Sequence, residues 1–183
     1  MEPTDEIVVS ATIAWLEKFV IGLNLCPFAK AIHVKNQIRY VVSQARRSSG
    51  LLDELRHELT SFAKDSSGQI ESVLLIHPYA LNDFVNYSGF LELCNLLIDE
   101  LNLDGIVQIA SFHPDYQFAE TDVGDITNYT NRSPFPMLHL LRESSVTLAI
   151  ESFPNSENIV KRNIMLMNTL GKAKLDKLCL FFE

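Results

Sequence analysis

Two histidines of this chain, His77 and His113, each precede a proline at the end of a predicted strand. The strands are the apolar runs 72–76 and 106–112. Proline lacks a backbone N–H and restrains the residue before it, so each pair is expected where a buried strand stops. Ligands of open α/β sheets bind at the carboxyl edge, which makes both imidazoles candidate site residues.

The residues after His113 have side chains suited to acid/base chemistry. Asp115 and Tyr116 follow it at the start of a polar stretch that runs to Ser133. An imidazole exchanges protons near neutral pH and a carboxylate can fix its tautomer, so His113 and Asp115 are catalytic candidates and Tyr116 is a candidate substrate contact. The structural alternative is a strand-end histidine that bonds a backbone carbonyl. The length and turn-forming residues of the stretch favour a binding loop or lid.

A third catalytic candidate is Cys26, which precedes a proline in a predicted loop. A nearby cation or histidine would stabilise its thiolate and make it a nucleophile or a soft metal ligand. The alternative is a small apolar side chain that packs beneath the loop. A thiolate and three imidazoles, from Cys26, His77, His113 and His139, are together a ligand set that would suit zinc. This signal is weak because the four residues come from distant segments of the chain. The sequence therefore assigns no metal, and the cofactor stays unknown.

Segment 127–136 is dense in hydrogen-bonding side chains and ends in two prolines. Asn128, Asn131 and Arg132 are candidate substrate contacts, since a stiff loop loses little entropy when it grips a ligand. Arg132 offers a forked contact for a carboxylate or phosphate. The alternative is that these side chains satisfy the segment's own turns.

His139 is the remaining candidate substrate contact. Pro136 predicts the first turn of a short helix that continues to Arg142. On that helix His139, Arg142 and Glu143 are spaced by three and four, so they share one face. Two interpretations follow, an internal ion pair and a lining of the site.

The elements that must position these residues follow from hydrophobic periodicity. Apolar residues spaced by three and four predict helices over 7–21, 52–62 and 83–101. Asn82 is the expected N-cap of the third of these helices. After the segment around His139 we expect a further turn or two over 146–153 and a final helix over 156–170, closed by Gly171. The apolar tail 175–182 fits a docked helix, an edge strand or a subunit contact.

The order of elements favours an α/β fold. We expect a single globular domain over 1–183, with helices around a small central sheet, a helical C-terminal third, and about three strands, at 37–43, 71–77 and 105–112. Right-handed crossovers would bring the ends of the second and third strands to one edge. An antiparallel first strand would bring the Cys26 loop to that edge directly, whereas a parallel one requires the loop to reach round.

Composition excludes several classes of protein. With 47% hydrophobic residues among 183, the chain can bury a substantial core. The formal charge of −8 disfavours nucleic-acid binding, and no apolar run is long enough to suggest a membrane span. Three widely spaced cysteines and an acidic start are typical of a cytoplasmic protein. No glycine-rich phosphate loop, nucleophile elbow or paired CxxC is present in the sequence.

Three blocks of the sequence resemble those of a bacterial family. They are GLNLCPFA at 22–29, ASFHPDYQF at 110–118 and NRSPFPMLHLLRE at 131–143. The chain is similar, over about 7–170, to the uncharacterised family called domain of unknown function 1415. The resemblance implies a cytoplasmic bacterial protein and supplies no activity, cofactor or catalytic residue.

Two hypotheses about function follow from the sequence. The first is a small-molecule enzyme of hydrolase or transferase type, with a pocket of Cys26, His113 and Arg132 roofed by the 113–136 loop. In this hypothesis Arg132 is the anchor for an anionic group of the ligand. The second is a non-catalytic regulatory module that binds a metabolite or a protein. In either case the apolar tail offers a surface for a homo-oligomer.

Overall fold

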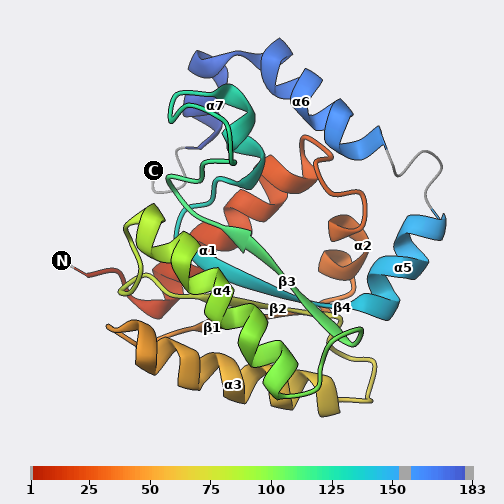
Figure 1. The fold of residues 1–183 in the computed structure, drawn as a ribbon. Helices are drawn as coiled ribbons and strands as arrows, with labels where there is room; N and C mark the ends of the chain where they lie inside the picture. Colours follow the sequence, from red (N-terminus) through yellow and green to blue (C-terminus); the bar gives the residue numbers. More distant parts are fainter. Residues whose placement is uncertain (1, 153–157, 180–183) are drawn as a thin grey trace.

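The computed structural model describes residues 2–152 and 158–179. Within them a mixed sheet of four strands has the order β1-β2-β4-β3 (Figure 1). The strands are β1 (Ile38–Val42), β2 (Ser72–Ile76), β3 (Val107–Phe112) and β4 (Met137–Arg142). β1 is parallel to β2, and β4 is antiparallel to both β2 and β3. This arrangement confirms the α/β class and the three expected strands, and it adds a fourth strand. Of the two orientations considered for the first strand, the structure has the parallel one.

The expected helix over 136–142 is wrong, because this segment is β4. Met137, Leu138 and Leu140 are fully buried, and the strand lies between β2 and β3. The segment Met137–Arg142 lacks the alternation of apolar and polar residues that marks a half-buried strand, because its polar residues His139 and Arg142 are three positions apart, which imitates a helix. On a strand His139 and Arg142 point to opposite faces of the sheet, so the shared face expected for them is also wrong.

Helices α3 (Ser48–Lys64) and α4 (Phe84–Glu100) cover one face of the sheet. Both expected helices are present. In α3 the buried residues are Leu51, Leu55, Leu59 and Phe62, so the stripe begins at Leu51 and not at the predicted Leu52. The N-cap of α4 is Asp83 instead of Asn82, and its carboxylate accepts the backbone N–H of Asn86 at 2.9 Å. The ends of β1 and β2 therefore lead into two well-formed helices that close the core on this side.

The other face is covered by the N-terminal helix. α1 (Asp5–Trp15) continues into a π-helical turn, η1 (Leu16–Ile21), and a connection containing α2 (Ala29–Val34) leads to β1. The buried Trp15 and Phe19 pack on this face, and the Trp15 ring meets that of Phe112 edge-on at 5.2 Å. A side chain at Gly22 would collide with the Lys18 carbonyl, so the end of η1 requires glycine.

The C-terminal third is helical after β4. It contains α5 (Glu143–Ser152), α6 (Ile159–Leu170) and α7 (Lys172–Leu178), after a 3₁₀ turn η2 (Ile126–Asn131) that precedes β4. Gly171, with φ at +74°, ends α6 as expected. Leu175 is fully buried, so the apolar tail begins as a docked helix. The last residues of the tail, 180–182, and residue 153, the last of the turns expected over 146–153, lie outside the described residues. Among the described helices, none combines the length and apolar character needed to cross a bilayer.

Candidate functional site

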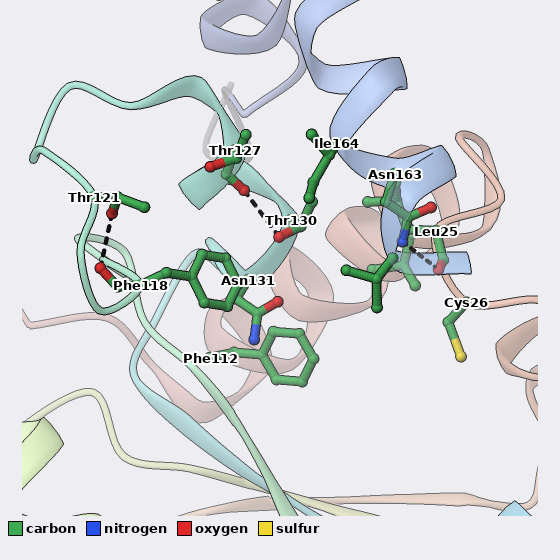
Figure 2. A pocket seen from close by; sticks show the side chains of 12 residues that line it. Leu25, Cys26, Phe112, Phe118, Thr121, Thr127, Thr130, Asn131, Asn163 and Ile164 are labelled. Atoms are coloured by element: carbon green, nitrogen blue, oxygen red, sulfur yellow. Dashed lines mark hydrogen bonds between the residues drawn. The ribbon is translucent and has the colours of Figure 1, made fainter. Parts of the chain in front are cut away.

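A cavity of about 420 Å³, here called the main cavity, lies between α6, the loop after β3, η2 and the start of the Cys26 loop (Figure 2). Its walls are mostly apolar, with Val20 and Leu25 from one side, Phe112 and Phe118 from another, and Val160 and Ile164 from α6. Its polar lining residues are Cys26, Thr121, Thr127, Thr130, Asn131 and Asn163. Of the residues predicted for the site, Cys26 and Asn131 therefore lie on one cavity.

Asn128 holds the loop that forms one wall of the main cavity. Its side chain is fully buried, and its Oδ1 accepts the Phe118 N–H and the Thr121 hydroxyl, both at 3.0 Å. Its Nδ2 donates to the Asp122 carbonyl at 3.0 Å. Three hydrogen bonds within one short loop order that loop before any ligand is present, as the structural alternative proposed.

Asn131 joins the loop to the end of the sheet. Its carbonyl accepts the His113 N–H at 3.2 Å, and its Nδ2 donates to the Ser111 carbonyl at 3.1 Å. Because that carbonyl requires a donor, the assignment of the amide nitrogen and oxygen is fixed. The Oδ1 is then the atom that is left to face the cavity.

Cys26 lies at the margin of the main cavity and is partly exposed. Figure 2 shows its sulfur directed away from the group of threonine and aromatic side chains. Burial raises the pKa of this thiol, and hydrogen bonds from the backbone of Phe28 and Ala29 offset the effect only in part. The thiol is accordingly neutral at pH 7, which is the opposite of what an activated nucleophile requires.

The two histidines of the histidine–proline pairs lie close together, as their strand-end positions predicted. Both rings are fully buried and pack against the Tyr87 ring, with centroid distances of 5.7 Å for His77 and 5.0 Å for His113. The Tyr87 hydroxyl accepts the Phe112 N–H at 3.0 Å and donates to the Met137 carbonyl at 2.9 Å. This group, here called the His-Tyr-His cluster, ties the ends of β3 and β4 together.

Both ring nitrogens of His113 are occupied. Its Nδ1 accepts the backbone N–H of Asp115 at 3.0 Å, so its Nε2 carries the proton and donates to the Leu81 carbonyl at 3.1 Å. Burial lowers the pKa of the ring, partly offset by the Leu81 bond. The hydrogen bond between Asp115 and the imidazole is made by the backbone N–H of Asp115, while its carboxylate acts on the ring only through its charge, which raises the pKa. The pair thus has the geometry of a strand-end cap.

His77 and His139 are two further neutral imidazoles. His77 Nδ1 donates to the Ala80 carbonyl at 2.9 Å, and burial lowers its pKa to about 4. His139 lies between Leu74 and Ala110 on the sheet face that α1 covers, where burial also lowers its pKa to about 4. Within the described part of the chain, neither Nε2 has a hydrogen-bond partner.

Arg132 faces a different, smaller cavity of about 260 Å³ that also includes Cys179 and Asp176. Its guanidinium stacks over the Tyr129 ring at 4.5 Å and donates to the Val123 carbonyl at 3.0 Å. Its neighbour in sequence, Asn131, belongs to the main cavity. The polypeptide therefore separates the expected cationic anchor from Cys26.

Tyr116 and the three histidines of the candidate metal set lie outside the main cavity. The Tyr116 hydroxyl is 3.1 Å from the Ser111 hydroxyl, and its ring packs on Phe84 and Phe118 at 5.2 and 5.0 Å. In residues 2–152 and 158–179 there is no group of three His, Cys, Asp or Glu side chains positioned for a metal ion. The four thiolate and imidazole candidates are divided among the main cavity, the His-Tyr-His cluster and the sheet.

The wall contributed by α6 was missed by the sequence interpretation. Val160, Asn163 and Ile164 recur at three and four positions, which places one amide and two aliphatic side chains on one helical face. That face is held to the body by Asn163, whose Nδ2 donates to the Leu25 carbonyl at 2.9 Å, and by Arg162, which donates to the Asn24 carbonyl. The spacing was visible in the sequence, but the partner of that face was not.

Comparisons with known proteins agree with the sequence blocks. Searches of curated proteins and of solved structures found no match. The model of the family described as "Protein of unknown function (DUF1415)" matches residues 7–177, which include all three blocks and every lining residue of the main cavity. The resemblance expected from those blocks is confirmed, and the chain belongs to the DUF1415 family.

Proposed function

We propose that this protein binds a small, largely apolar molecule reversibly in the main cavity. The observation that carries the proposal is the cavity itself, because a volume of about 420 Å³ lies within the usual range for ligand pockets. Apolar walls with a few fixed polar groups are the usual composition of such pockets. The walls come from segments that are distant in sequence, which is typical of a site assembled by the fold.

The loop wall is already ordered by its own hydrogen bonds. Asn128 secures the Phe118 and Thr121 backbone region, and Asp125 caps η2 by accepting the Thr127 N–H at 2.8 Å. A ligand therefore does not have to order this wall when it binds, which favours affinity for a molecule of modest size.

Binding is better supported than catalysis by the arrangement of the predicted residues. An enzyme built on Cys26, His113 and Arg132 needs these side chains around one reacting group. Here Cys26 borders the main cavity, His113 caps a strand with both nitrogens occupied, and Arg132 faces the second cavity. The catalytic roles stay predictions that would require the side chains to move.

Titration with N-phenyl-1-naphthylamine, a neutral dye whose fluorescence rises in apolar surroundings, tests the proposal. We expect a saturable signal at one dye per chain. Ile164→Trp adds bulk to the cavity wall and should weaken binding at least tenfold, about 1.4 kcal/mol. The matched control is Met165→Trp, one position along the same helix, where the side chain is 70% exposed and is not part of the wall. Its affinity should equal that of the unchanged protein.

Two results would contradict the proposal. One is the absence of saturable dye binding to the folded protein. The other is an equal loss of affinity in both tryptophan variants, because this would place the dye on the outer surface of α6 instead of in the cavity.

A further inference from the structure

We propose, on the basis of the binding function above, that the ligand of the main cavity is uncharged and carries an N–H or O–H group that donates to Oδ1 of Asn131. This inference concerns the chemical class of the ligand. It rests on the way in which the polar hydrogens of the cavity wall are already used.

The threonine hydroxyls of the wall donate to protein acceptors. The Thr121 hydroxyl shares its hydrogen between the Phe118 carbonyl at 2.8 Å and Asn128 Oδ1 at 3.0 Å. Thr127 donates to the Asp125 carboxylate at 2.7 Å, and Thr130 donates to the Thr127 carbonyl at 2.9 Å. A hydroxyl has a single hydrogen to donate. A ligand that meets these oxygens therefore meets their lone pairs.

One atom of the two lining amides makes no hydrogen bond among the described residues. Asn163 donates one Nδ2 hydrogen to the Leu25 carbonyl at 2.9 Å, and its Oδ1 accepts from Arg162 at 2.9 Å. Asn131 donates one Nδ2 hydrogen to the Ser111 carbonyl, and its Oδ1 has no partner there. Figure 2 shows this oxygen turned toward the Leu25 side of the cavity. The amide atom of the wall that is not yet engaged is thus an acceptor.

Charge in the wall points in the same direction. None of the lining residues carries a formal charge, since the thiol of Cys26 is neutral at pH 7. A carboxylate that entered would lose its hydration and find no charged partner there, and Asp125 lies behind Thr127. Arg162 is a cation in contact with the lining residue Asn163, and its Nη2 is engaged by Asn163 Oδ1 and the Asn24 carbonyl. An uncharged donor suits this wall better than an anion does.

Three probes of one shape separate these possibilities. Naphthalene has no polar group, 2-naphthol has one O–H donor, and 2-naphthoate has a carboxylate at the same ring position. We would measure how well each displaces N-phenyl-1-naphthylamine at pH 7. A hydrogen bond to a buried amide oxygen predicts that 2-naphthol competes about five- to tenfold better than naphthalene. The 2-naphthoate ion should be the weakest of the three.

A variant links the preference to one atom. Asn131→Leu removes the acceptor, so the affinities of 2-naphthol and naphthalene for the variant should differ by less than twofold. Because this change also removes the bond to the Ser111 carbonyl, the circular dichroism spectrum of the variant serves as the control for folding. If the variant does not fold, the order of the three probes on the unchanged protein still decides the inference.

The outcomes distinguish this inference from the proposed function. If the dye does not bind to the unchanged protein, the proposed function fails. If the dye binds and naphthalene and 2-naphthol compete equally, the cavity stands and the acceptor inference is overturned. Tightest binding of 2-naphthoate would also overturn it and would indicate that Arg162 acts as an anchor for anions.

Discussion

The phenol of Tyr87 provides the sharpest test of how the strand ends are held. Its hydroxyl bridges the Phe112 N–H and the Met137 carbonyl, which belong to directly opposed residues of β3 and β4. The residue is fully buried, so Tyr87→Phe leaves a donor and an acceptor without water to replace the lost bonds. An unsatisfied buried group costs about 1–3 kcal/mol, and we therefore expect a loss of about 3 kcal/mol in the free energy of unfolding.

Urea denaturation followed by circular dichroism measures this loss. The matched control is Tyr79→Phe, where a half-buried hydroxyl donates to the Pro3 carbonyl at 2.7 Å near the start of the chain. Solvent can replace that bond, so the control should lose less than about 1 kcal/mol. Equal losses in the two variants would refute the reasoning, because they would mean that the Phe112 and Met137 groups bond each other once the bridge is gone.

Three further predictions concern separate parts of the chain. Burial lowers the pKa values of His77 and His139 to about 4 in the folded state, whereas both imidazoles should take up protons near pH 6.5 once the chain is unfolded. The contribution of each histidine to the free energy of unfolding is therefore fully present above pH 6.5. It should fall by up to about 3 kcal/mol for each histidine as the pH drops to 4. Denaturation at pH 7 and 4.5 measures this, and His139→Leu should reduce the difference. Cys26 should react with iodoacetamide at pH 7.5 more slowly than free cysteine, by mass spectrometry of its peptide, and a faster rate would contradict its raised pKa. Arg142→Ala should lower the free energy of unfolding, measured by urea denaturation, by about 2–3 kcal/mol, because the guanidinium donates to three carbonyls at the end of α3 and in the segment after it. Arg142→Lys should not restore this loss, since an ammonium group cannot reproduce the forked contact.

Sequence patterns predicted the elements that show an apolar stripe at helical spacing or a short aliphatic run between turns. The stripe of α3 and the strand β2 were found because one repeats at three and four residues and the other is a short aliphatic run between turns. The convergence of His77 and His113 followed from the same reasoning, since two parallel strands end at one edge. β4 was missed because Pro136 directly before it imitated a helix start, and because the spacing of His139, Arg142 and Glu143 by three and four residues imitated one face of a helix.

Two of the loop residues predicted for the site border the main cavity, whereas the wall that α6 contributes to this cavity was not predicted. Cys26 and Asn131 were selected for their chemistry, and both border the main cavity. Arg132 was selected for the same reason, yet it follows Asn131 at the end of η2, and consecutive side chains there face different hollows. No local pattern tells which of two neighbours faces a cavity. The contribution of Ile164 depends on how α6 docks on η2, which is a contact between distant parts of the chain.

The two asparagines of η2 show why the number of polar residues in a loop is a poor guide to its ligand. Asn128 and Asn131 are three positions apart in one 3₁₀ turn, where residues three apart lie on the same side. Asn128 orders the loop through hydrogen bonds of both its Oδ1 and its Nδ2. The side chain of Asn131 bonds the Ser111 carbonyl through its Nδ2, and its Oδ1 has no partner among the described residues. A loop that satisfies its own donors in this way becomes rigid and presents acceptors to the space it encloses. The polarity of 113–136 that suggested a grip on an anion thus favours, in the folded chain, an uncharged donor.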